Sequence, residues 1–227
     1  MRPRICVPVM EKTVERTVRS IRLLERHDPD FVEVRFDLMK SPSPLSRIRD
    51  ATERPLIATN RSKMQGGRLP RTEDSKLETL LHAAQEGFDY VDIELNTRNA
   101  RGVIRDLKQY GAGAIVSYHN EKLTPTEATL ESILTSERRV GADICKIVAT
   151  AKSYRDNLRC LTLVDEHARK TKLVCFSMGT LGITSRILSP ILGAYFTFAS
   201  YRAGRETAAG QIPIRELQTL YKELGVA

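Results

Sequence analysis

Eight short apolar segments recur along the chain, and each is followed by a segment with helical periodicity or a helix start signal. The apolar segments are residues 4–9, 31–38, 55–60, 90–95, 113–119, 143–149, 172–178 and 194–200. Most are rich in Val, Ile, Phe and Tyr, which favour strands. Strict alternation of strand and helix implies parallel strands with right-handed crossovers. Eight such units predict an α/β fold that closes into a single (β/α)8 barrel, the TIM barrel.

The segment 72–87 shows the clearest helical pattern. Thr72 is placed to cap its N-terminus and Gly87 to end it. Its apolar residues recur with the spacing of one helical face: Leu77, Leu80, Leu81 and Ala84. Helices are also predicted over 13–26, 97–109, 124–139, 153–169, 179–189 and 213–223, with a short one over 43–50. Because no linker or low-complexity tract interrupts the alternation, residues 1–227 are expected to form one domain.

Composition narrows the class of protein. The N-terminal sequence MRPRICVPVM has no apolar core of a signal peptide, and no apolar stretch approaches membrane-spanning length. We therefore expect a cytoplasmic protein without a membrane partner. Four cysteines without CxxC spacing (Cys6, Cys145, Cys160 and Cys175) indicate reduced core thiols rather than disulfides or a metal site. The net charge of +8 is spread among carboxylates, which disfavours nucleic-acid binding.

The second and fourth strand-like segments alternate apolar and charged residues. In residues 31–38, Glu33, Arg35 and Asp37 fall on one face, and in residues 90–95 Asp92 and Glu94 do the same. Helices cover the outside of a barrel, so the charged set is expected to point inward. Charges inside a barrel must be paired, and such pairing is costly unless function uses it. The pattern favours a polar site at the C-terminal ends of the strands.

Two residues near strand ends are candidates for catalysis. Lys146 lies within the apolar run GADICKIVAT, where a lysine is rarely buried without a partner or a chemical role. It could complete an ion network with Asp92, Glu94 or Glu33. Alternatively, burial and neighbouring cations could leave its amine able to form an imine with a carbonyl. His119 ends the fifth strand, where it could move the proton that an imine acidifies, or could merely cap the strand.

Two stretches near the C-terminus have the residues of an anion site. The sequence SMGTLGITSR (177–186) places glycines and hydroxyls before Arg186, and AAGQIPIRELQ (208–218) carries Gln211 just before a helix. Helix N-termini and arginine both favour a carboxylate or a phosphate. Neither motif is specific alone, because each also fits an ordinary turn or helix cap.

Taken in order, six motifs resemble those of type I 3-dehydroquinate dehydratases. They are EVRFD (33–37), NRSKMQGG (60–67), SYHN (117–120), GADICK (141–146), SMGTLGITSR (177–186) and GQI (210–212). The resemblance spans the chain and implies a (β/α)8 barrel, without cofactor or metal, that dehydrates 3-dehydroquinate in the shikimate pathway. It implies that Lys146 forms the imine and that His119 is the general base and then the acid.

The resemblance also implies substrate contacts. Arg186, Gln211 and Thr207 would hold the substrate carboxylate, and Glu33, Arg35 and Arg61 would contact the ring hydroxyls. The expected partner is therefore an anionic cyclic hydroxy-keto acid, and assembly into a homodimer is left open.

Two positions depart from the family pattern. Gln65 stands where a Glu is common; an amide can still orient the histidine, but it cannot stabilise an imidazolium as a carboxylate does. Thr207 stands where a Ser is common and keeps the hydroxyl. The loop YRAGRET (201–207) could be a mobile lid that pivots at Gly204 or a plain solvated loop.

Two other functions are compatible with parts of the sequence. A class I aldolase also places an imine-forming lysine on a barrel strand and binds a sugar phosphate at the last loops. A basic protein that binds nucleic acid could bury its lysine for structural reasons. Trapping of the imine with borohydride, in the presence of either substrate, distinguishes the aldolase. Salt-sensitive retention of RNA or DNA would identify the nucleic-acid-binding protein.

Overall fold

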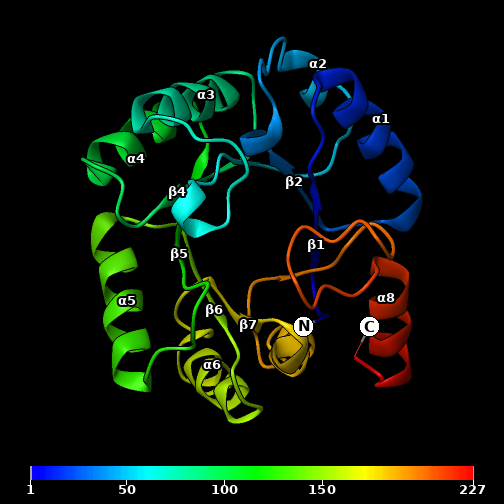
Figure 1. Ribbon diagram of the computed structural model, residues 1–227, viewed down its shortest axis with the longest axis vertical. Coiled ribbons are helices and arrows are strands. Elements are labelled where there is room, and N and C mark those ends of the chain that lie inside the picture. Colours follow the sequence, from blue (N-terminus) through cyan, green and yellow to red (C-terminus); the bar gives the residue numbers. More distant parts are fainter. Residues whose placement is uncertain (1, 227) are drawn as a thin grey trace.

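A ring of eight parallel strands forms the centre of the computed structural model, which describes residues 2–226, and helices surround it (Figure 1). The strands are β1 (Ile5–Val9), β2 (Phe31–Arg35), β3 (Leu56–Thr59), β4 (Tyr90–Glu94), β5 (Gly113–His119), β6 (Ile144–Thr150), β7 (Leu173–Met178) and β8 (Thr197–Phe198). Neighbours pair in the order β7-β6-β5-β4-β3-β2-β1-β8. The predicted (β/α)8 barrel is confirmed.

The helices follow the strands as the sequence pattern predicts. They are α1 (Val14–Leu24), α2 (Ser46–Arg49), α3 (Glu73–Gln85), α4 (Ala100–Gln109), α5 (Glu127–Val140), α6 (Arg155–His167), α7 (Ile183–Leu188) and α8 (Ile214–Glu223). The Thr72 side chain accepts a hydrogen bond from the Ser75 amide and so caps α3. Gly87 follows that helix with a φ of +84°, which a glycine adopts without strain. No helix in the described range is both long and apolar enough to span a membrane.

Two strands are shorter than predicted. The segment 31–38 is a strand only to Arg35, because β3 ends at its partner Thr59; residues Phe36–Leu38 then form a 3-10 turn. Asp37 therefore lies on this turn rather than on the inner face of a strand. The segment 194–200 is a strand only at Thr197–Phe198, where it pairs with β1. The chain then turns away, and Ser200 bridges to Pro213.

The seam between β7 and β8 carries no strand ladder within residues 2–226. Near the N-terminal ends of these strands, one hydrogen bond of 2.7 Å spans the seam from the Tyr195 amide to the Leu173 carbonyl. Nearer the C-terminal ends, the Arg186 guanidinium lies 4.3 Å from the Phe176 ring centre on β7 and 3.4 Å from the Phe198 carbonyl on β8. The opening in the barrel wall is thus occupied by an arginine.

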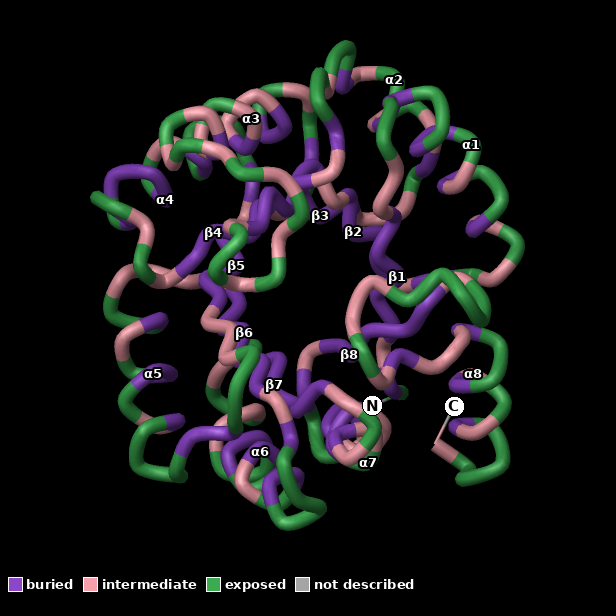
Figure 2. The backbone as a smooth tube through the Cα atoms, in the orientation of Figure 1, coloured by how far each residue is buried: buried purple, intermediate pink, exposed green. Residues whose placement is uncertain are grey.

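The interior of the barrel is layered. Charged side chains point inward as predicted, among them Glu33, Asp92 and Glu94, all buried. Toward the N-terminal ends of the strands the interior is closed by an apolar layer, which the pattern of charged residues did not indicate. This layer consists of Cys6, Phe31, Ile57, Ile115, Ile144 and Phe196. The outer faces of the strands pack against the helices, so the strands are buried while the helices expose their outer sides (Figure 2). The charged side chains are therefore confined to the part of the interior nearer the C-terminal ends of the strands.

Candidate active site

A cavity of about 450 Å³ opens at the C-terminal ends of the strands. All nine site residues expected from the sequence line it: Glu33, Arg35, Arg61, Gln65, His119, Lys146, Arg186, Thr207 and Gln211. They come from six different strand–helix units, which only barrel closure brings together. The other three histidines of the chain, His27, His82 and His167, do not line this cavity.

Lys146 projects from β6 into the bottom of the cavity and is held from two sides. Its Nζ donates to Asp92 Oδ2 at 2.9 Å and lies 3.4 Å from Glu33 Oε1. The same atom lies 4.5 Å from the centre of the Phe198 ring. The ion network considered from the sequence thus exists with Asp92 and Glu33, although not with Glu94. The nearest charged groups are carboxylates rather than the cations anticipated above, because Asp92 stands between Lys146 and Arg61.

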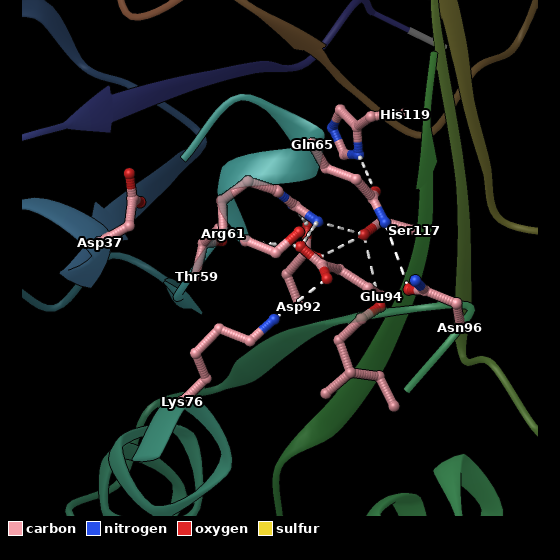
Figure 3. A network of polar contacts seen from close by, with 12 residues as sticks. Asp37, Thr59, Arg61, Gln65, Lys76, Asp92, Glu94, Asn96, Ser117 and His119 are labelled. Carbon is pink, nitrogen blue, oxygen red and sulfur yellow. Dashed lines mark hydrogen bonds and ion pairs between the residues drawn. The ribbon is translucent and has the colours of Figure 1, made fainter. Parts of the chain in front are cut away.

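Asp92 is the centre of the charge network (Figure 3). Its Oδ2 accepts from Arg61 at 2.7 Å as well as from Lys146, and its Oδ1 accepts from the Ser117 hydroxyl at 2.6 Å. Burial alone raises the pKa of Asp92, but Arg61 and Lys146 outweigh it and hold the pKa well below its usual value. Asp92 is therefore ionised at every physiological pH. The alternation in residues 90–95 placed Asp92 inside the barrel, but nothing in the sequence showed that it joins two cations.

His119 ends β5, next to the strand that carries Lys146. The register pairs Ser117 with Lys146 and His119 with Val148, so His119 lies one inward step nearer the mouth. Its Nδ1 lies 3.2 Å from Gln65 Oε1. A carbonyl oxygen only accepts, so Nδ1 carries the hydrogen and Nε2 is left as the basic nitrogen. Burial lowers the pKa of His119 well below its ordinary value, and Arg61 and Lys146 lower it further, so the ring is neutral.

Arg186 is a buried cation without a carboxylate. Its side chain comes from α7, and only 1% of the residue is exposed. Its two terminal nitrogens lie 3.4 Å from the carbonyls of Phe198 and Ala209, and Nε has no partner. Among residues 2–226 no acidic side chain forms an ion pair with it. Burial lowers the pKa of Arg186 to about 9. A guanidinium in this state, facing a cavity, fits an anionic ligand.

Four other expected site residues of the cavity are bonded to protein groups. Arg35 binds Asp37 through two nitrogens at 2.7 and 3.0 Å. Glu33 Oε1 accepts from the Thr59 hydroxyl at 2.9 Å. Gln211 and Thr207 bond each other: the Thr207 amide donates to Gln211 Oε1 at 2.8 Å, and Gln211 Nε2 donates to the Thr207 hydroxyl at 3.1 Å. A ligand at Thr207 and Gln211 must exchange these bonds for its own.

The loop 201–207 separates this cavity from a second one of about 540 Å³, which is lined by residues of β1, α1 and the loop itself. Thr207 lines both cavities, but Lys146 and His119 line only the first. Residues 202–206 are exposed, and movement of this loop as a lid stays a prediction. The chemistry-bearing side chains all belong to the cavity at the centre of the barrel.

Comparison with known proteins places the chain in a family. Residues 5–227 match the family model described as type I 3-dehydroquinase. The 3-dehydroquinate dehydratase of Methanothermobacter thermautotrophicus is 36% identical over 227 residues, covering 99% of this chain and 98% of that protein. The enzyme of that name from Coxiella burnetii is 31% identical over 222 residues, covering 97% and 93%.

Solved structures agree with the sequence relatives. The crystal structure of 3-dehydroquinate dehydratase from Geobacillus kaustophilus superposes with a TM-score of 0.92 at 29% identity and covers 99% of this chain and 92% of that one. The enzyme from Aquifex aeolicus superposes with a TM-score of 0.80 at 29% identity, covering 97% and 98%.

Proposed function

The chain belongs to the type I 3-dehydroquinase family, and we propose that the cavity at the mouth of its barrel is where it converts 3-dehydroquinate to 3-dehydroshikimate. The reaction is a hydro-lyase step of the shikimate pathway, as the resemblance in the sequence implied. The observation that carries the site is the meeting of Lys146, His119 and an unpaired Arg186 in one cavity. The roles of the other cavity residues are inferred from their positions around these three residues.

In the proposed mechanism, Lys146 Nζ attacks the substrate ketone and water is lost to give an imine. The imine withdraws electrons and acidifies the adjacent C–H, so that His119 Nε2 can remove the proton. The imidazolium then returns the proton to the leaving hydroxyl, and hydrolysis of the imine releases the product. Asp92 supports the chemistry of both catalytic residues, because its fixed negative charge lies next to Lys146 and attracts the imidazolium of His119.

Substrate binding in this proposal uses the cation that the protein leaves unpaired. The substrate carboxylate binds Arg186, with Gln211 and Thr207 as further donors once they release each other. Glu33, Arg35 and Arg61 contact the ring hydroxyls. Arg61 has the least freedom to do so, because Asp92 and Ser117 already occupy its terminal nitrogens at 2.7 Å. We therefore propose that Arg61 acts mainly by fixing Asp92.

Trapping with borohydride tests the imine directly. Borohydride reduces an imine to a stable secondary amine, so incubation with 3-dehydroquinate should add the substrate or its dehydrated product, in each case less the ketone oxygen, to Lys146 and to no other lysine, as peptide mass mapping would show. Incubation with a sugar phosphate should add nothing. Labelling only with the sugar phosphate would instead support the class I aldolase alternative, which shares the imine but binds phosphate.

The pH profile tests the role of His119 and of Gln65. A base works only when neutral, so kcat/KM falls as the pH drops through the pKa of His119. Because that pKa is lowered, we expect the fall in the wild type below pH 6.5. In Gln65→Glu a carboxylate faces Nδ1 and raises this pKa, so the fall should move up by about one pH unit and kcat should rise.

A charge placed on the same turn controls for general electrostatic effects. Lys63→Glu adds negative charge to the turn Lys63–Gln65, but residue 63 is exposed and does not line the cavity. Its profile should match that of the wild type. An unchanged profile in Gln65→Glu would show that Gln65 does not act on the histidine.

Three further expectations stay proposals. Residues 1–227 are proposed to act as one catalytic domain that needs only its own side chains. A cytoplasmic location is supported by the four cysteines, which are all free and buried, as expected in a reducing compartment. A homodimer is supported by two exposed apolar side chains at the start of α6: Tyr154, which precedes the helix, and Leu158, which lies one turn further along it.

A further inference from the structure

Gln65 bonds a second side chain besides His119. Its Nε2 donates to Asn96 Oδ1 at 3.3 Å, and Figure 3 shows His119, Gln65 and Asn96 in a row. Asn96 follows β4 by two residues and is exposed at the mouth of the barrel. Gln65 itself is half-exposed on a short turn, so little else restrains its long side chain. These two hydrogen bonds are the only ones that the structure gives to the Gln65 side chain in the described part of the chain.

The row of hydrogen bonds has a direction. His119 Nδ1–H donates to Gln65 Oε1, and Gln65 Nε2–H donates to Asn96 Oδ1. If the Gln65 amide were reversed, its N–H would face Nδ1, and this is tolerable only while Nδ1 has no hydrogen. An imidazolium has hydrogen on both nitrogens. The observed direction is therefore the one compatible with His119 after it has taken up the substrate proton.

We infer that Asn96 is a positioning residue, which acts through Gln65 to keep the basic nitrogen of His119 free and to stabilise the charged ring. This inference rests on the proposed role of His119 as the base. It explains how a glutamine can stand where the family commonly has a glutamate: the amide has one correct end, and Asn96, which presents Oδ1 to Gln65 Nε2, is bonded in the orientation that matches it. An asparagine also carries a donor, so its own amide must keep this orientation, and an aspartate at residue 96 would fix it. A carboxylate at position 65 has two equivalent oxygens, so its orientation does not need to be fixed by a neighbour.

The chemistry of residue 96 then predicts an order of activity. Asn96→Asp can only accept, so it enforces the observed direction, and kcat should be equal to or above that of the wild type. Asn96→Leu removes the acceptor at similar size, and kcat should fall about five-fold, the worth of one neutral hydrogen bond. Asn96→Lys can only donate, so it reverses the amide, and kcat should fall more than about ten-fold. Because residue 96 is exposed, all three variants should fold.

The decisive experiment repeats the series in the Gln65→Glu background. There the carboxylate accepts from residue 96, so Asn96→Lys should be well tolerated. Asn96→Asp should be the least active, because it sets two carboxylates side by side. For each variant we would measure kcat, KM and the pH dependence of kcat, with borohydride trapping of Lys146 as a control for imine formation. The acid limb of kcat should move with residue 96 while trapping stays unchanged.

The outcomes separate this inference from the proposed function. An order at position 96 that reverses between the wild-type and the Gln65→Glu backgrounds supports the inference. A flat series, or the same order in both backgrounds, overturns it, since a merely structural role or a simple charge effect would not reverse. If His119→Ala keeps wild-type activity, the proposed function itself fails, whatever the series shows.

Discussion

Replacing Lys146 with arginine is expected to lower kcat by about 10⁴-fold or more, because a guanidinium cannot form the imine on which the reaction depends. Arginine is the sharper substitution because it keeps a cation beside Asp92 and Glu33, with which Lys146 Nζ now pairs. Alanine would leave Glu33 without a cation and Asp92 with Arg61 as its one remaining cation, and so would mix loss of chemistry with loss of stability. The absorbance rise of the conjugated enone product measures the rate.

Lys152→Arg is the matched control, because Lys152 is exposed and does not line the cavity. It should leave both kcat and borohydride trapping unchanged. Melting temperature would verify that the Lys146→Arg barrel is folded. Wild-type kcat in a folded Lys146→Arg protein would rule out the imine mechanism.

Much of the barrel could be read from the sequence because its signals are local. Buried parallel strands leave runs of Val, Ile and Phe, and α3 is marked at its ends by Thr72 and Gly87. The lengths of β2 and β8 could not be read in this way. A strand extends only as far as a neighbour pairs with it: β2 ends opposite Thr59, the last residue of β3, and β8 pairs with only two residues of β1. Such pairing is not encoded in the segment itself.

The site residues could be nominated individually, but their contacts could not. Position at strand ends singled out Lys146, His119 and Arg186, and all three line one cavity. That Asp92 joins Lys146 to Arg61 depends on which side chains meet across the barrel, and residues 61, 92 and 146 lie far apart in the chain. Asn96 left no signal at all, because an exposed Asn after a strand is ordinary turn chemistry.

The two buried arginines of the cavity differ in whether the protein supplies a carboxylate partner. Arg61 is neutralised inside the protein by Asp92 at 2.7 Å. Within residues 2–226 the Arg186 guanidinium instead lies over the Phe176 ring, makes two hydrogen bonds of 3.4 Å to carbonyls and leaves Nε without a hydrogen-bond partner. A buried charge without a counterion costs free energy in the free protein. The same charge is available to a ligand carboxylate, which would supply the missing partner.

Replacing Arg186 with methionine should therefore change activity and stability in opposite directions. We expect kcat/KM to fall by about 10²- to 10³-fold, because the substrate loses a charge-assisted, bidentate contact. We expect the free protein to become more stable by roughly 1 kcal/mol, or about 3 °C in Tm, because an apolar side chain replaces an unpaired cation against Phe176. Steady-state kinetics and thermal unfolding without ligand measure the two effects.

Arg61→Met is the matched control, since it removes a buried guanidinium that does have a carboxylate partner. It should lower the melting temperature, because it leaves the buried Asp92 with one cation fewer. Substrate or product should raise the melting temperature of the wild type but hardly that of Arg186→Met, because the ligand binds the variant weakly. A loss of stability in Arg186→Met as large as that in Arg61→Met would show that the protein itself satisfies Arg186, and the guanidinium would then not be held in reserve for a carboxylate.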